Sequence, residues 1–103
     1  MRVLIVDDHP SFRASARTLL EAEGYEIVGE AENGAAALLA VKELKPDLVL
    51  LDVQLPDMDG FQVADQLCRL ADPPAVVLTS SRDRRRLRPL HPGLRRQRLR
   101  PEG

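Results

Sequence analysis

Several oxygen-bearing side chains stand at the ends of apolar segments in this sequence. Asp7 and Asp8 directly follow one apolar run, and Asp52 follows a second. Thr79 follows a third. If these runs are parallel strands, their carboxyl ends meet at one edge of a sheet, where the three carboxylates repel one another unless a cation neutralises them. Oxygen ligands with room for water suit Mg²⁺, so these residues predict a divalent-ion site. For any single acid, a helix cap or an ordinary solvated loop is the alternative interpretation.

The elements that must position these side chains alternate along the first 80 residues. Strands are expected at 2–6, 25–31, 47–52 and 75–78, and helices at 10–23, 33–44 and 61–71. Pro10 suits a first helical position, and Asn33 can cap the second helix. Strands that alternate with helices through short loops form a parallel sheet covered on both faces. We therefore expect an α/β fold, a doubly wound parallel sheet with about four strands and three helices.

Length and composition point to one intracellular domain. A chain of 103 residues has room for a single domain that folds without disulfides or metals. Cys68 is the only cysteine and cannot form an internal disulfide. The sequence shows no signal-peptide pattern and no apolar run near the roughly 20 residues of a membrane helix. These features predict a cytoplasmic protein without a membrane partner.

Charge divides the chain sharply. Residues 1–80 carry 6 basic and 14 acidic side chains, whereas residues 81–103 carry 9 basic and 2 acidic ones. In the second part, arginines repel one another, Pro89 and Pro92 interrupt any helix, and few leucines are available to bury. We expect residues 1–81 to form the folded domain and residues 82–103 to be a disordered, Arg-rich tail.

Three motifs resemble those of the bacterial response-regulator receiver family of two-component signalling. They are Val6-Asp7-Asp8-His9-Pro10, the segment Leu51-Asp52-Val53-Gln54-Leu55-Pro56-Asp57-Met58-Asp59-Gly60, and Val77-Leu78-Thr79-Ser80. Each alone is a modest signal, but all three in order on the first, third and fourth expected strands make a specific combination. The resemblance covers about residues 1–81 and implies a flavodoxin-like receiver that is incomplete, acts in a phosphorelay and is not an enzyme.

The resemblance also implies a role for each site residue. Asp52 would be the phosphoacceptor, whose carboxylate attacks the phosphohistidine of a sensor histidine kinase. Asp8 would ligate Mg²⁺ together with Asp52, and Asp7 would hold the water shell of the metal. The backbone carbonyl of Gln54 would be a further ligand, and the ion would offset charge on the transferring phosphoryl group. Thr79 would be the switch residue, whose hydroxyl turns inward to a phosphoryl oxygen.

Four neighbouring residues receive simpler interpretations. Asp57 and Asp59 are expected to serve the turn and the start of the third helix. His9 is interpreted as a loop neighbour of the acids rather than as a catalytic group. Cys68 is expected to be a small core residue on the apolar stripe of the third helix.

The family pattern breaks after Ser81. A complete receiver continues with a fourth helix, a fifth strand that ends in a lysine, and a fifth helix, and nothing here matches them. The broad guanidinium of an arginine such as Arg100 is no ready substitute for that compact ammonium. We expect impaired phosphorylation and signalling, and an exposed strand edge at 75–78. The Arg, Leu, Pro and Gly composition of the tail favours a truncated or frameshifted product.

Two other classes of function remain open on the sequence alone. The arginine tail could bind nucleic acid nonspecifically through phosphates, although it lacks aromatic residues for stacking on bases. The chain could also be an inactive fragment. A hydrolase that uses the same acids is a weaker alternative, because no separate nucleophile or general acid is recognisable.

Overall fold

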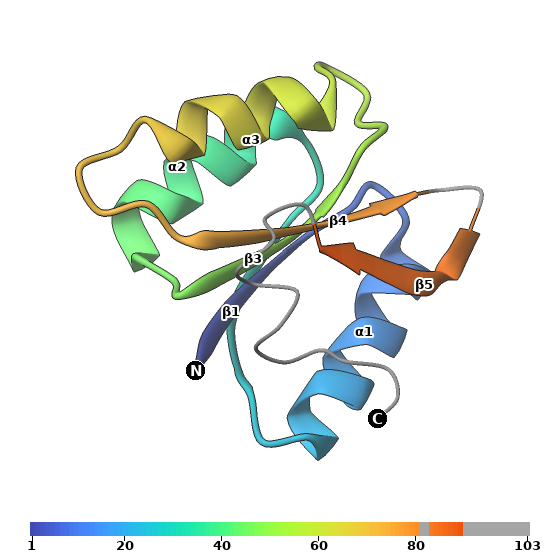
Figure 1. Ribbon diagram of the computed structural model, residues 1–103. Helices are drawn as coiled ribbons and strands as arrows, with labels where there is room; N and C mark the ends of the chain where they lie inside the picture. Colours follow the sequence, from blue (N-terminus) through green and yellow to red (C-terminus); the bar gives the residue numbers. More distant parts are fainter. Residues whose placement is uncertain (81–82, 90–103) are drawn as a thin grey trace.

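The computed structural model describes residues 1–80 and, as backbone, residues 83–89. Its elements in chain order are β1 (Arg2–Val6), α1 (Pro10–Ala22), β2 (Glu26–Ala31), α2 (Gly34–Leu44), β3 (Leu48–Asp52), α3 (Gly60–Cys68), β4 (Ala75–Ser80) and β5 (Asp83–Pro89). The strands form one sheet in the order β2-β1-β3-β4-β5, with α1 on one face and α2 and α3 on the other (Figure 1). The strands β1 to β4 are parallel, which confirms the predicted α/β fold.

The central strand β3 lies between β1 and β4 and is buried along its whole length. Its side chains alternate between two hydrophobic clusters, as the period of a strand requires. Val49 and Leu51 belong to the cluster beneath α2 and α3, whereas Leu48 and Leu50 belong to the cluster on the α1 side. A continuous apolar run is therefore needed at β3, because neither face of this strand meets water.

The helix boundaries follow from capping. Asn33 accepts a hydrogen bond from the backbone N–H of Ala36 at 2.8 Å, which confirms its predicted role as the cap of α2. The helix α3 ends earlier than predicted, at Cys68, and the prediction of Cys68 as a core residue is wrong because its side chain is exposed. The buried stripe of α3 passes instead through Val63 and Leu67, and the next position along the helix is turned away from the sheet. None of the helices described here has the length and apolarity that crossing a bilayer requires.

The structure differs from the prediction at residues 83–89, where it has a strand rather than a structureless segment. β5 pairs antiparallel with β4, with Ser80 opposite Asp83 and Val77 opposite Pro89. Only two residues separate the strands, whereas a parallel connection needs a dozen or more, so the antiparallel pairing is the one that the chain length permits. The unpaired backbone groups of an edge strand favour such pairing whatever the side-chain pattern. The rest of the predicted tail lies outside the described residues.

An ion-pair network joins α1 to β2. Glu30 on β2 accepts hydrogen bonds from the Nε atoms of Arg13 and Arg17, each at 2.9 Å. Arg13 also donates to the backbone carbonyl of Asp7, at the end of β1. Burial by itself would raise the pKa of Glu30, but the hydrogen bonds and charges of Arg17 and Arg13 outweigh it and lower this pKa below its ordinary value of 4.5. The network thus favours the ionised form of Glu30 in the folded state.

Because the folded-state pKa of Glu30 is lowered, its contribution to stability is present above the ordinary pKa and is lost as the pH falls through the folded-state value. We predict that Glu30→Gln lowers the free energy of unfolding most at neutral pH and that the difference from wild type shrinks in acid. Urea denaturation at a series of pH values measures this. Glu43→Gln, which removes an exposed acid on α2, is the matched control, and an equal pH dependence in both variants would contradict the prediction.

The chain makes a close approach where α3 begins. A Cβ atom on Gly60 would lie 2.4 Å from the carbonyl oxygen of Asp52 and 2.6 Å from the Cα of Val53. The N–H of Gly60 donates to the carbonyl of Val53 at 2.8 Å, which fixes this approach. Only glycine fits here without movement of the backbone that follows β3.

We predict that Gly60→Ala lowers the free energy of unfolding by about 1–3 kcal/mol, since the added methyl group meets backbone rather than a movable side chain. Chemical denaturation of the purified variant checks this value. Gln66→Ala, at an exposed position of the same helix, should change stability by less than about 0.5 kcal/mol. If Gly60→Ala is as stable as this control, the backbone after β3 can move to make room for the methyl group without a measurable loss of stability, which would contradict the prediction.

Candidate functional site

Strand alternation brings three polar side chains to one edge of the sheet. Asp7 follows β1, Asp52 ends β3 and Thr79 lies near the end of β4, directly opposite Asp52 in the register. The alternation that puts Leu50 and Val77 on the α1 side predicts the same side for Asp52 and Thr79. Asp7, Asp52 and Thr79 are each at most 2% exposed. These are the buried polar residues of the described chain, and they lie together where a doubly wound sheet forms its ligand site.

The acids form a compact group. Asp7, Asp8, His9 and Asp52 each offer one potential ligand atom, and these atoms all lie within 4.8 Å of one another. Asp8 differs from the two buried acids because its side chain is 36% exposed. The group is therefore buried where it meets the sheet, at Asp7 and Asp52, and is accessible to solvent at Asp8.

The structure brings His9 into this group, which the sequence analysis treated only as a neighbour. Its Nδ1 atom lies 2.9 Å from a carboxylate oxygen of Asp7 and 2.9 Å from one of Asp8. Its backbone N–H donates to Asp7 Oδ1 at 2.7 Å. The adjacency of His9 to two acids was the available signal, but the direction of its side chain depends on the turn between β1 and α1. The Nδ1 atom of His9 thus lies within hydrogen-bonding distance of both acids.

The backbone after β3 contributes to the same edge. The N–H of Gln54 donates to Asp52 Oδ1 at 3.1 Å, which orients that carboxylate. The N–H of Val53 donates to the carbonyl of Thr79 at 3.0 Å and so holds the segment against β4. Gln54 also forms an isolated antiparallel bridge with Asp59, which closes the loop between β3 and α3. The predicted site residues therefore lie on segments that the structure holds together at this edge.

The donor set fits a hard divalent cation. Two buried carboxylates and a third, partly exposed one lie close enough to share an ion, and burying such charges without a counter-charge is costly. Mg²⁺ prefers oxygen ligands and retains several waters, which the open side at Asp8 allows. The imidazole of His9 is the softer donor of the group, so the carboxylates are the better ligands for such an ion.

The two other acids of the loop have different roles. Asp59 is the N-cap of α3 and forms a capping box with Gln62, as expected for a residue at the start of the third helix. Asp57 instead reaches α2, where it accepts hydrogen bonds from the N–H groups of Gly34 and Ala35 at 2.7 and 2.9 Å. These bonds lower the pKa of Asp57, with the bond from Gly34 as the largest cause. No local signal identifies this partner, because 23 residues separate Asp57 from Gly34.

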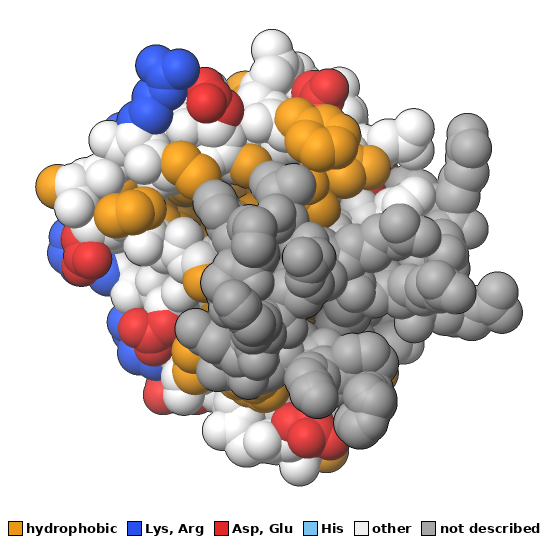
Figure 2. All heavy atoms as spheres, viewed as in Figure 1, with side chains coloured by type: hydrophobic (Ala, Val, Ile, Leu, Met, Phe, Trp, Pro, Cys, Tyr) orange, Lys and Arg blue, Asp and Glu red, His pale blue; other side chains and the backbone are white. Residues whose placement is uncertain are grey.

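The nucleic-acid alternative depends on side chains of residues 82–103, which lie outside the described part of the structure. On the face seen in Figure 2, the basic and acidic side chains of the described residues form separate small groups around the rim. The visible Lys and Arg side chains lie beside Asp and Glu side chains and not in a continuous basic group, which phosphate binding would favour.

Comparison with known proteins agrees with the fold and the motifs. The family model of the response regulator receiver domain matches residues 3–91. A putative transcriptional regulator of Pseudomonas aeruginosa is 48% identical over 79 residues, which are 76% of this chain and 38% of that protein. A protein-glutamate methylesterase/protein-glutamine glutaminase of Agrobacterium fabrum is 39% identical over 80 residues, 77% of this chain and 23% of that protein.

Solved structures give the same result. The signal receiver domain of the putative response regulator NarL from Mycobacterium tuberculosis has a TM-score of 0.71 and 39% identity, and the match covers 91% of this chain and 71% of that one. The chain spans well under half the length of these curated relatives. Several others like them are described as transcriptional regulators or transcriptional regulatory proteins. The similarity therefore concerns one module that is found with different outputs, and the chain belongs to the response regulator receiver domain family.

Proposed function

We propose that this chain is a phosphoacceptor module of a two-component phosphorelay, in which Asp52 receives a phosphoryl group from a sensor histidine kinase in the cytoplasm. The observation that carries the proposal is the buried carboxylate of Asp52 beside Asp7 and Asp8, at the ligand-binding edge of a receiver fold. Asp7, Asp8, Asp52 and the backbone carbonyl of Gln54 are the groups proposed to hold Mg²⁺. The bound ion would supply positive charge for the transferring phosphoryl group.

For this phosphoryl transfer, the protein has mainly to position the reacting groups and to stabilise their charge. One oxygen of the Asp52 carboxylate forms a bond to phosphorus, and the phosphorus–nitrogen bond of the phosphohistidine breaks. The electron pair of that bond returns to the imidazole of the kinase, which then takes up a proton. The hydrogen bond from the N–H of Gln54 to Asp52 Oδ1 holds the carboxylate in one orientation, which supports in-line attack by the other oxygen.

Thr79 is proposed as the residue that reports the phosphorylated state. It lies opposite Asp52 in the strand register and is 2% exposed. Its hydroxyl is therefore one strand away from the new phosphoryl group and can hydrogen-bond one of its oxygens. Such a bond would link the phosphoryl group to the end of β4, where the carbonyl of Thr79 also accepts a hydrogen bond from Val53.

We expect phosphoryl transfer to Asp52 to be slower than in family members that have the lysine. No lysine follows Lys45 in the sequence, so the ammonium that assists phosphoryl transfer in the family is not among these residues. Loss of such a charge weakens stabilisation of the transition state. We therefore propose that Asp52 accepts a phosphoryl group slowly and that output is impaired.

The proposal predicts that the purified chain, incubated with Mg²⁺ and a small-molecule phosphodonor, gains the mass of one phosphoryl group in an intact-mass spectrum. Asp52→Asn should abolish the gain, because the amide is not a nucleophile, and excess EDTA should abolish it in the wild type. Asp72→Asn, at an exposed position of the α3–β4 loop, is the matched control and should be phosphorylated like wild type.

Two results would overturn the proposal. A folded wild-type chain that gains no mass over many hours with Mg²⁺ would show that these residues do not form a working acceptor. A gain that persists in Asp52→Asn would place the phosphoryl group on another side chain.

A further inference from the structure

The tip of the loop between β3 and α3 is hydrogen-bonded to the helix α2. Both oxygens of the Asp57 carboxylate accept hydrogen bonds from the first turn of α2, from Gly34 at 2.7 Å and from Ala35 at 2.9 Å. These N–H groups have no acceptor within the helix, because they belong to its first turn. Asn33 supplies the acceptor for Ala36. An acid from a distant part of the chain thus completes the cap of α2.

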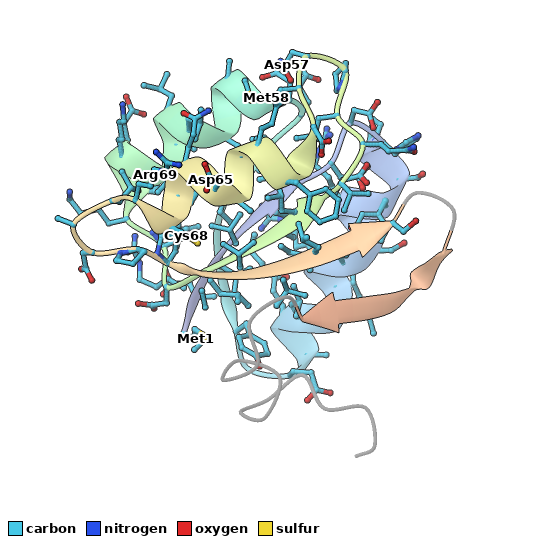
Figure 3. All side chains as sticks on the ribbon, turned by 45° about the horizontal axis from the view of Figure 1, so that its top comes forward. Met1, Asp57, Met58, Asp65, Cys68 and Arg69 are labelled. Atoms are coloured by element: carbon cyan, nitrogen blue, oxygen red, sulfur yellow. The ribbon has the colours of Figure 1, made fainter. Side chains whose placement is uncertain are left out.

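Packing reinforces these hydrogen bonds. A Cβ atom on Gly34 would lie 2.4 Å from Cγ and 2.7 Å from Sδ of Met58, so the Met58 side chain lies directly against the backbone of α2. Figure 3 shows Asp57 and Met58 together at the tip of the loop, beside the N-terminal end of α2. Charge favours the same arrangement, since a carboxylate is stabilised at the positive end of a helix. Two successive residues therefore hold the loop tip in place.

The base of the loop is fastened to the phosphoacceptor. Gln54 donates to Asp52 Oδ1 and bridges to Asp59, and Gly60 is packed against the carbonyl of Asp52. The backbone from Gln54 to Asp59 is therefore held at the acids on one side and at α2 on the other. A change at Asp57 would free the tip from α2, and the short closed loop would pass that change on to Gln54.

We propose that Asp57 is a positioning residue for the divalent ion: its bonds to α2 hold the β3–α3 loop so that the backbone of Gln54, which donates to Asp52 Oδ1, stays beside the acid group. The inference rests on the proposed function, which assigns Gln54 as a ligand. Asp57 lies outside the group formed by Asp7, Asp8, His9 and Asp52. The proposed effect is on the affinity for the ion, which is measured separately from the effect on stability.

The test is a calorimetric titration of the purified chain with MgCl₂ alone, without a phosphodonor. Asp57→Ala removes both acceptor oxygens and should raise the Kd for Mg²⁺ by about tenfold, the lower end of what loss of an outer-shell partner costs a metal site. Asp57→Asn keeps one acceptor oxygen and should give an intermediate Kd. Asp65→Ala is the matched control, because Asp65 is an exposed acid on α3 that pairs with Arg69 on the surface (Figure 3), and its Kd should equal that of wild type.

The readouts separate positioning from stability. Thermal unfolding in EDTA measures the structural cost of each variant, and the titrations are made at a temperature where circular dichroism shows every variant to be folded. If Asp57→Ala does not fold, Asp57→Asn decides the test. Equal Kd values for wild type and the folded Asp57 variants would overturn the proposal and leave the proposed function standing.

Two further outcomes separate this inference from the function on which it rests. A wild type that binds Mg²⁺ more tightly than its Asp57 variants but gains no phosphoryl group would support the positioning role and overturn the proposed function alone. A wild type that binds no Mg²⁺ would overturn both the positioning role and the proposed metal site.

Discussion

Two carboxylates that are almost fully removed from water, those of Asp7 and Asp52, share one edge of the sheet, and much of the surrounding structure serves to keep them there. Burying even one ionised carboxylate is costly unless hydrogen bonds and a counter-charge offset it. Backbone N–H groups meet both acids, from His9 at Asp7 and from Gln54 at Asp52. Neutral donors alone do not balance two charges, so the arrangement favours a cation. The fully buried strand β3 and its parallel neighbours fix the acids at this spacing.

The site is asymmetric, and the asymmetry has a physical basis. On the side of β3, the close packing of Gly60, the bridge from Gln54 to Asp59 and the bonds of Asp57 restrict the backbone. On the other side, the partly exposed Asp8 opens the group to solvent. A restricted backbone on one side and solvent access on the other would suit the proposed site, which has to exchange waters and admit a phosphoryl group without losing its geometry.

The sequence predicts most of the fold because its signals are local. Apolar runs that end in acids specify the strands, and Pro10 and Asn33 mark helix starts that the structure has at the same places. The acid group was predictable for a related reason, since the ends of parallel strands meet at one edge. The bond of Asp57 to α2, the side-chain contacts of His9 with Asp7 and Asp8, and the exposure of Cys68 were not predictable. The first depends on how a loop meets a distant helix, the second depends on the turn between β1 and α1, and the third depends on the rotation of α3 about its axis.

The strand β5 illustrates how topology decides which charges reach the site. A parallel strand beside β4 would bring its carboxyl end to the functional edge, where the family has its lysine. β5 runs the other way and brings its first residue, Asp83, opposite Ser80 at that edge. Its pairing also occupies the edge of β4 that was expected to be exposed, and its carboxyl end points away from the functional edge. In the proposed phosphoryl transfer, the divalent ion would then supply most of the positive charge at this edge, so the geometry of its ligands would matter more than in receivers that have the lysine.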